Sequence, residues 1–194
     1  MDNVARSDRT VRAEIFLRTG SKMDILPGLV EKDFWVCWTL KHLFSIAGFA
    51  PHLLFKGGTT LSKVFGVIQR FSEDIDLAVD YAMLGFTGDR SPMAKMSNTR
   101  RTKLLDEMLA SCRQYIATDF ITVLRQRMAE ILPAGEDWDL VVDAADGHIV
   151  NFRYPRTAEA PAYVRPEVRL EMGTHAELIP NDRTIRGSPS WLPS

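Results

Sequence analysis

The sequence predicts an α+β fold in which helices flank a mixed β-sheet. Three observations lead to this prediction: the chain begins with helical apolar spacing, its middle and its end hold short alternating segments, and one long helical segment separates the two. A doubly wound α/β protein would instead alternate strands and helices throughout. With 194 residues, of which 45% are hydrophobic and 25% charged, the chain is long enough to form one domain with its own core.

The first part of the chain is expected to hold two helices and a strand. Residues 7–20 have amphipathic helical spacing, and Pro27-Gly28 indicates a break after them. Apolar residues cover most of the circumference of a helix over 29–47, which predicts a core helix that stops near Gly48. The short apolar run 52–56 is then expected to form a strand.

The middle of the chain is expected to hold a short helix, a strand and a long helix. A helix is expected to open at 59–65, directly after two glycines. Residues 73–80 alternate strictly between polar and apolar, which makes them the clearest strand in the chain. Residues 84–97 have the composition of a loop, and apolar spacing from about 99 to 132 predicts one long helix or two.

Three further strands are expected after the long helix. A hairpin turn at Asp146-Gly147 joins the first two of them. The expected strands are 138–142, 148–154 and 167–172. The predicted organisation is a single domain at 1–180, with a helical N-terminal part at 7–48 and a core at 49–180, followed by an irregular tail at 181–194.

Charge is unevenly distributed along the chain. The whole sequence carries 24 basic and 25 acidic residues, so it is not a polycation that binds nucleic acid by charge alone. Residues 73–87 hold four carboxylates and no basic side chain, whereas 1–72 and 88–127 each have a net charge of +4. An acidic patch between basic blocks suits a site for a metal ion and a polyphosphate. Solvated surface charge is the alternative interpretation.

Several classes of protein are excluded or disfavoured. No apolar run approaches the ~20 residues that cross a bilayer, so no membrane is expected. The two cysteines, Cys37 and Cys112, need not pair, which favours a reduced, cytoplasmic protein. The chain has no GxSxG, HExxH or paired CxxC motif, so serine hydrolase, zincin and zinc-finger interpretations have no support.

The strand at 73–80 is expected to place Asp74 and Asp76 on one face and Ile75 and Leu77 on the other, because side chains alternate along a strand. Two carboxylates so close together repel each other unless a cation lies between them. Hard oxygen ligands at this spacing suit Mg²⁺, which takes substrate phosphates as further ligands. An exposed strand face with two solvated acids would give the same pattern, so this strand alone leaves both interpretations open.

A third carboxylate is expected from the last strand, where Glu167, Arg169 and Glu171 share one face. A carboxylate on a neighbouring strand could bind a second metal ion or accept the proton of an attacking hydroxyl. Glu171 is the first candidate and Glu167 the substitute. A surface strand with an internal charge ladder is the alternative.

Gly57 and Gly58 lie between a predicted strand and a predicted helix. Glycines at such a junction let the backbone approach a ligand closely, and free N–H groups at the start of a helix bind phosphate. The spacing matches neither the P-loop nor the GxGxxG motif, and a tight turn is the alternative. Nearby hydroxyl and cationic side chains could add donors and positive charge: Lys56, Thr59, Thr60, Ser62, Lys63 and Arg70.

Together these motifs resemble the AbiEii/AbiGii toxin family. The resemblance is carried by FKGGTTLSK at 55–63 and RFSEDIDL at 70–77, which match a GGT–L–K segment followed by RxSxDxDL. The EKDFW segment at 31–35 is also similar to a family feature. The similarity covers about residues 28–80, and Glu171 more loosely. Because that family belongs to the nucleotidyltransferase superfamily of polymerase-β type, the resemblance implies a polymerase-β-like nucleotidyltransferase core.

The resemblance also implies a reaction and roles for individual residues. An acceptor hydroxyl would attack the α-phosphate of a nucleoside triphosphate in line, with pyrophosphate leaving. The metal ion is expected to be Mg²⁺. The residues implied are Gly57, Gly58, Thr59, Lys63, Arg70 and Ser72 for nucleotide binding, Asp74 and Asp76 as metal ligands, and Asp74, Asp76 and Glu171 for catalysis.

The expected biological role is that of the toxin in a toxin–antitoxin or abortive-infection system, beside a separate antitoxin protein. Related toxins transfer nucleotides onto tRNA ends, so tRNA is the expected acceptor. The basic residues Arg100, Arg101, Lys103, Arg113, Arg125 and Arg127 could form a face for RNA phosphates, with a solvated helix face as the alternative.

Two other functions remain open at this point. One is a small-molecule nucleotidyltransferase, such as an enzyme that modifies an antibiotic. The other is a truncated, non-catalytic nucleotide-binding protein, because members of the resembling family usually continue into a C-terminal helical region. A chain without the acceptor-binding half would bind a nucleotide without transferring it.

Overall fold

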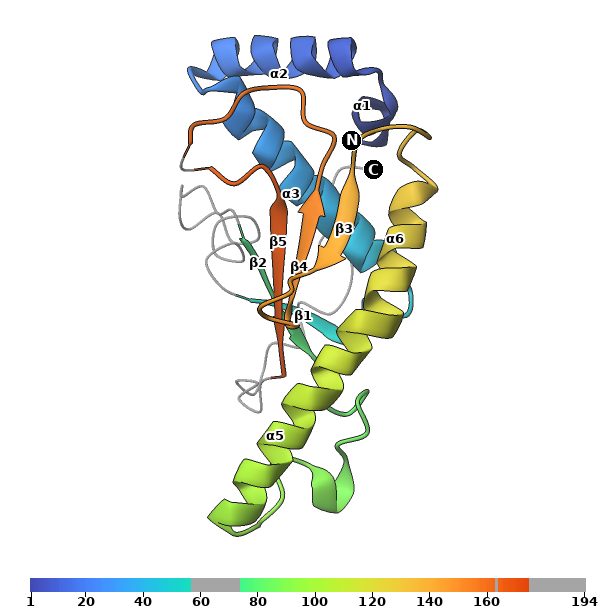
Figure 1. The fold of residues 1–194 in the computed structure, drawn as a ribbon, viewed down its shortest axis with the longest axis vertical. Coiled ribbons are helices and arrows are strands. Elements are labelled where there is room, and N and C mark those ends of the chain that lie inside the picture. Colours follow the sequence, from blue (N-terminus) through green and yellow to red (C-terminus); the bar gives the residue numbers. More distant parts are fainter. Residues whose placement is uncertain (57–73, 163, 175–194) are drawn as a thin grey trace.

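A mixed β-sheet forms the centre of the structure, with helices packed on one face and across one end (Figure 1). The computed structural model describes residues 1–56, 74–162 and 164–174. Within these residues the sheet has five strands in the order β1-β2-β5-β4-β3. The strands are β1 (Leu53–Lys56), β2 (Asp74–Val79), β3 (Asp139–Val142), β4 (Ile149–Arg153) and β5 (Val168–Gly173).

The pairing of the strands confirms the predicted α+β class with a mixed sheet. β2 and β5 are parallel, and the pairs β1–β2, β5–β4 and β4–β3 are antiparallel. All five strands lie within one or two residues of the expected segments. β3 and β4 meet at the expected hairpin, where the side chain of Asp143 accepts hydrogen bonds from the backbone N–H groups of Ala145 and Asp146.

One face of the sheet is apolar and packs against α3 (Pro27–Ser45), which crosses behind the strands (Figure 1). Ile75 and Leu170 contribute to this face because apolar residues alternate with polar ones along β2 and β5. Trp35 and Trp38 of α3 are fully buried, and both rings lie about 6 Å from that of Phe152 in β4. The polar residues of β2 and β5 therefore face away from this core.

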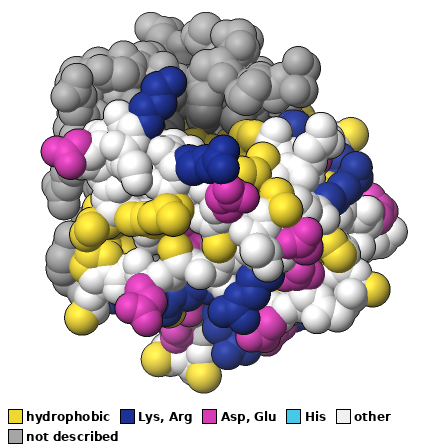
Figure 2. Space-filling view, turned by 90° about the horizontal axis from the view of Figure 1, so that it is seen from above, with side chains coloured by type: hydrophobic (Ala, Val, Ile, Leu, Met, Phe, Trp, Pro, Cys, Tyr) yellow, Lys and Arg dark blue, Asp and Glu magenta, His cyan; other side chains and the backbone are white. Residues whose placement is uncertain are grey.

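The other described helices surround this core. They are α1 (Asp2–Arg6), α2 (Arg9–Met23), α5 (Asn98–Tyr115) and α6 (Ile121–Ala129), with a 3₁₀ turn at Gly88–Arg90. α2 lies across one end of the sheet, and on that end apolar, basic and acidic side chains are interspersed (Figures 1 and 2). Within the described ranges, no helix is both long enough and apolar enough to span a membrane.

Two boundaries differ from the sequence prediction. Pro27-Gly28 opens α3 rather than breaking the chain, because the missing N–H of a proline costs nothing in the first turn of a helix. Gly48 does not end this helix: α3 stops at Ser45, since Ile46 already adopts an extended conformation with ψ of 111°.

The predicted long helix forms as α5 and α6 joined by a π-helical turn at Ile116–Phe120. α6 packs against α3 and β3, whereas the N-terminal half of α5 projects beyond the sheet together with the preceding loop (Figure 1). The expected helix at 59–65, the end of the predicted domain at 175–180 and the predicted tail at 181–194 lie outside the described residues.

Candidate functional site

A row of charged side chains crosses three neighbouring strands on the polar face of the sheet. Asp76 in β2 lies opposite Lys56 in β1 and opposite Glu171 in β5. Adjacent strands are about 4.8 Å apart, and paired residues point to the same face. Two residues earlier in β2, on the same face, Asp74 lies opposite Arg169 in β5. The sheet therefore brings the expected residues Asp74, Asp76 and Glu171 together, while their roles stay predictions.

Electrostatic repulsion is concentrated on Asp76. Burial raises the pKa of Asp76 above its ordinary value, and the negative charges of Glu171 and Asp74 raise it further. Lys56 partly offsets this effect by lowering the same pKa. A cation placed against these carboxylates would relieve the repulsion.

The donor set fits Mg²⁺ as a partly solvated ion. Asp74 and Asp76 offer hard carboxylate oxygens, and Mg²⁺ usually binds through one or two carboxylates, completing its shell with water and substrate phosphates. Among the described residues, no group of three or more His, Cys, Asp or Glu side chains converges to hold a metal ion. The two aspartates thus suit an ion whose remaining ligands are water and substrate phosphates, rather than an ion bound by protein side chains alone.

An open pocket of about 330 Å³ lies beside these acids. Lys56, Asp76 and Glu171 line it, together with Arg169, whose Nε lies 2.8 Å from Oε1 of Glu171. This volume is at the lower end of the range for small-molecule sites. The pocket therefore combines carboxylates and cations within one small volume, as binding of a phosphate with a metal ion would require.

Glu167, the substitute for the third carboxylate, lies one residue before β5 and does not line this pocket. Its backbone carbonyl instead accepts a hydrogen bond from the Nζ of Lys32. The register of β5 thus favours Glu171 as the third acid.

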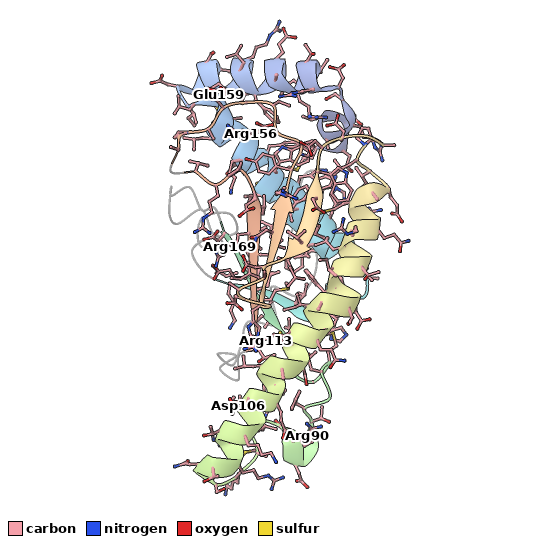
Figure 3. The ribbon with its side chains drawn as sticks, in the orientation of Figure 1. Arg90, Asp106, Arg113, Arg156, Glu159 and Arg169 are labelled. Carbon is pink, nitrogen blue, oxygen red and sulfur yellow. The ribbon has the colours of Figure 1, made fainter. Side chains whose placement is uncertain are left out.

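Sequence reasoning missed a polar cluster at the rim of the pocket. Nδ1 of His148 lies 3.4 Å from Nε of Arg113 and 3.2 Å from Oδ1 of Asp146, and His148 lines the pocket. Figure 3 shows Arg113 on α5 and Arg169 on the sheet. The sequence did not indicate this cluster, because His148 reaches the pocket only through the long-range pairing of β4 with β5. The signal was the Asp146-Gly147 turn, which delivers His148 to the edge of β4.

The nucleotide-binding residues that the resemblance implied lie outside the described residues: Gly57, Gly58, Thr59, Lys63, Arg70 and Ser72. Their segment follows Lys56 directly in the chain, and Lys56 itself lines the pocket. Their roles stay predictions.

Residues 38–192 match the family model described as nucleotidyl transferase AbiEii toxin of a type IV toxin–antitoxin system. The chain belongs to the AbiEii family. Comparison with curated proteins and with solved structures gives no match. The AbiEii match spans the acid-bearing strands β2 and β5 and the pocket between β1 and β4.

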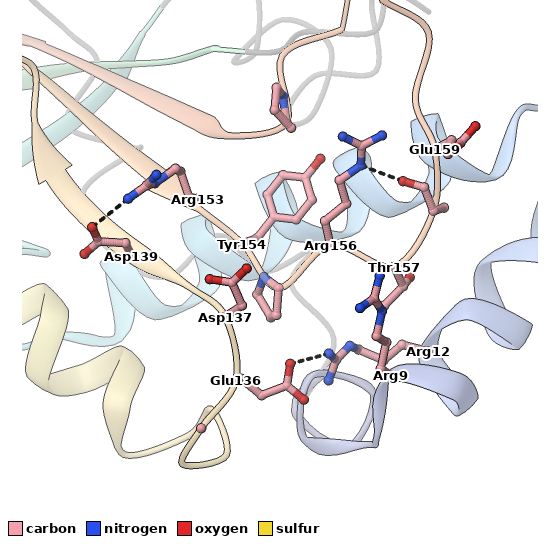
Figure 4. Close-up of a pocket in the computed structure, with 14 residues that line it drawn as sticks. Arg9, Arg12, Glu136, Asp137, Asp139, Arg153, Tyr154, Arg156, Thr157 and Glu159 are labelled. Atoms are coloured by element: carbon pink, nitrogen blue, oxygen red, sulfur yellow. Dashed lines mark hydrogen bonds and ion pairs between the residues drawn. The ribbon is translucent and has the colours of Figure 1, made fainter.

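The AbiEii chain has a second, larger hollow of about 720 Å³ between α2 and the ends of β3 and β4 (Figure 4). Two of the arginines that line it form ion pairs: Arg12 with Glu136 at 2.6 Å, and Arg153 with Asp139 at 2.9 Å. None of the expected site residues lines it. The first pair links α2 to the segment before β3, and the second links β4 to β3.

The EKDFW segment, which precedes the AbiEii match, holds the connection between β4 and β5 by hydrogen bonds. Both oxygens of buried Glu31 accept hydrogen bonds from the segment between β4 and β5, from the N–H and hydroxyl of Thr157 and the N–H of Ala158, all at 2.8 Å. Nζ of buried Lys32 donates to the carbonyls of Arg165, at 3.0 Å, and Glu167. These two side chains fix the connection that delivers Glu171.

We expect Mg²⁺ to stabilise this protein through Asp76. Because the folded-state pKa of Asp76 is raised, the folded protein binds this proton more tightly than the unfolded chain does. Ionised Asp76 therefore costs stability at pH 7 without metal, and this cost disappears as the pH falls through the folded pKa. At a Mg²⁺ concentration of 100 Kd, the free energy of unfolding should rise by about 2.7 kcal/mol, which thermal melting would register as several degrees.

The matched variants give the control. Asp76→Asn should melt at or above the wild-type temperature without metal and should gain little from Mg²⁺. Asp137→Asn, an exposed acid of the larger hollow, should respond to Mg²⁺ as the wild type does. Equal stabilisation of Asp76→Asn and the wild type would contradict the assignment.

Proposed function

We propose that this protein transfers a nucleoside monophosphate from a nucleoside triphosphate to a hydroxyl group of RNA, with tRNA as the leading acceptor and Mg²⁺ as the cofactor. The observation that carries the proposal is the register of three strands, which sets Asp76 between Lys56 and Glu171 at the wall of one pocket. Membership of the AbiEii nucleotidyltransferase family supports the reaction type.

The reaction makes one bond and breaks one. The acceptor oxygen bonds to the α-phosphorus, the bond between that phosphorus and the bridging oxygen breaks, and pyrophosphate leaves with the electron pair. The hydroxyl proton passes to a carboxylate, for which Glu171 is placed beside Asp76. Bound Mg²⁺ would neutralise charge that develops on the phosphate oxygens.

We propose a separate role in this reaction for each of the described site residues. Asp74 and Asp76 would hold the metal ion, and Lys56 would attract the polyphosphate into the pocket. Arg169 would keep the side chain of Glu171 oriented through the 2.8 Å ion pair. Since the reaction needs nucleoside triphosphates and RNA, the proposed site of action is the cytoplasm, and the toxin role requires a cognate antitoxin.

The test is transfer of label. Purified protein is incubated with Mg²⁺, total tRNA and each α-labelled nucleoside triphosphate in turn, with the Asp74→Asn/Asp76→Asn double variant as the control. We expect label on RNA with at least one nucleotide, and none with the double variant or with excess chelator. Binding of nucleotide without transfer to RNA would overturn the proposal, in favour of a small-molecule transferase or a binding protein.

A further inference from the structure

The projecting end of α5 and the loop before it form a strongly basic surface, which we name the basic arm and define as residues 81–105 (Figure 1). It carries five basic side chains and a single acidic one, Asp89, in a protein whose net charge is −1. All five are exposed to solvent. They are Arg90, Lys95, Arg100, Arg101 and Lys103.

The basic arm is a packed unit. Phe86 from the loop is buried against Leu104 and Met108 of α5, and the guanidinium of Arg90 lies 4.7 Å from the centre of the Phe86 ring. The Nη1 atom of Arg101 donates to the backbone carbonyl of Pro92 at 2.8 Å. The cations are thus presented on a fixed scaffold, which lowers the entropy cost of binding a charged ligand.

The ion pairs of the structure divide the six basic residues that were expected to form one RNA-binding face. Arg125 pairs with Asp139 and Arg127 with Glu130, both at 3.1 Å, so these two are neutralised within α6 and its surroundings. In the arm, Arg90 pairs with Glu107 at 3.1 Å. Among the described residues, Lys95, Arg100, Arg101 and Lys103 form no ion pair with an acid.

The arm is continuous with the pocket through α5. Leu109 of this helix lines the pocket. One turn further along, Arg113 (labelled in Figure 3) lies at the rim beside His148. At 1.5 Å per residue, Lys103 and Arg100 lie about 9 and 14 Å from Leu109 along the helix axis. A nucleic acid strand that rises about 3.4 Å per nucleotide covers this distance in roughly three to four nucleotides.

The chemistry of the arm suits a polyanion better than a protein partner. Protein interfaces centre on apolar and aromatic anchors and are depleted of charge at their core, whereas the arm exposes two large apolar side chains, Met93 at 59% and Leu105 at 38%, among five cations. The opposite end of the molecule mixes basic, acidic and apolar side chains, without a surface of one sign (Figure 2).

We propose that the basic arm binds the sugar–phosphate backbone of the acceptor RNA about three to four nucleotides from the hydroxyl that enters the pocket. The inference rests on the proposed function and adds the surface that recognises the acceptor. The arm supplies affinity without reading base sequence, because its contacts are to phosphates.

The test compares two charge reversals of equal size. Arg100→Glu/Lys103→Glu changes the arm, and Arg18→Glu/Lys22→Glu changes exposed residues of α2 at the other end. Binding of fluorescently labelled tRNA is followed by anisotropy between 50 and 200 mM salt, without nucleotide. The arm variant should bind at least about 10-fold more weakly, with the slope of log K against log salt reduced by about 1.4 to 1.8 for two lost phosphate contacts.

Each outcome supports or overturns the inference. Unchanged affinity and salt slope in the arm variant, or an equal loss in the α2 variant, would overturn it and leave a protein partner for the arm. Binding and transfer, both measured with intact Asp74 and Asp76, separate the two proposals: RNA binding that depends on the arm, without any transfer of label, supports the arm and refutes the function. If the arm variant binds tRNA and transfers label as the wild type does, the inference about the arm is refuted and the proposed function stands.

Discussion

Asp76→Asn is expected to abolish nucleotidyl transfer while the protein stays folded. The substitution keeps the size of the side chain but removes a charge that lies between Lys56 and Glu171 at the pocket wall. Loss of one group that stabilises developing charge lowers kcat by roughly 10²- to 10³-fold, and loss of the proposed metal ligand would add to this. Initial rates with labelled nucleoside triphosphate and tRNA measure the effect.

Substitutions on β5 and just before it supply the matched comparison. Glu171→Gln should also lower kcat strongly, because Glu171 adjoins Asp76 across the parallel pair. Glu167→Gln removes the same charge four residues earlier, outside the pocket, and should leave kcat within about twofold, as changes away from a site usually do. If Glu167→Gln and Glu171→Gln were equally impaired, the third acid would have been assigned incorrectly.

These residues also show what the sequence could predict about the site. Strict alternation predicted that Asp74 and Asp76 share a face, because a strand has a period of two residues. The choice between Glu171 and Glu167 required the register of β5 against β2, and the same alternation permits either. His148 was missed for the same reason: its place at the pocket depends on pairing between β4 and β5.

The fold was predictable wherever local pattern and tertiary packing agree. The five strands and the long helix followed from periodicity, since their buried faces are continuous in sequence. The start of α3 at Pro27 and its end at Ser45 were not predicted, because a proline or a glycine near a boundary permits more than one conformation. The expected basic face divided because Arg125 pairs with Asp139, which belongs to β3.

Glu31→Ala is expected to cost the largest amount of stability of any substitution proposed, about 3–5 kcal/mol in the free energy of unfolding. Glu31 is buried at 1% exposure and accepts three hydrogen bonds, from Thr157 and Ala158. Its removal leaves two backbone N–H groups and a hydroxyl without acceptors in the interior, which is the costly way to break a buried polar network. Urea unfolding measures the change, with exposed Glu14→Ala as a control expected within about 0.5 kcal/mol.

The more conservative Glu31→Gln separates local loosening from global unfolding. Glutamine keeps one acceptor oxygen, so the protein should fold, while one anchor of the connection between β4 and β5 is lost. Amide hydrogen exchange should then accelerate at Thr157 and Ala158 well before it does at Leu170 in the centre of β5, because local opening requires less free energy than global unfolding. Uniform acceleration across all three amides would mean that Glu31 contributes only to global stability. Selective acceleration, accompanied by slower transfer, would show that the EKDFW segment acts on the site by holding the connection that leads to Glu171.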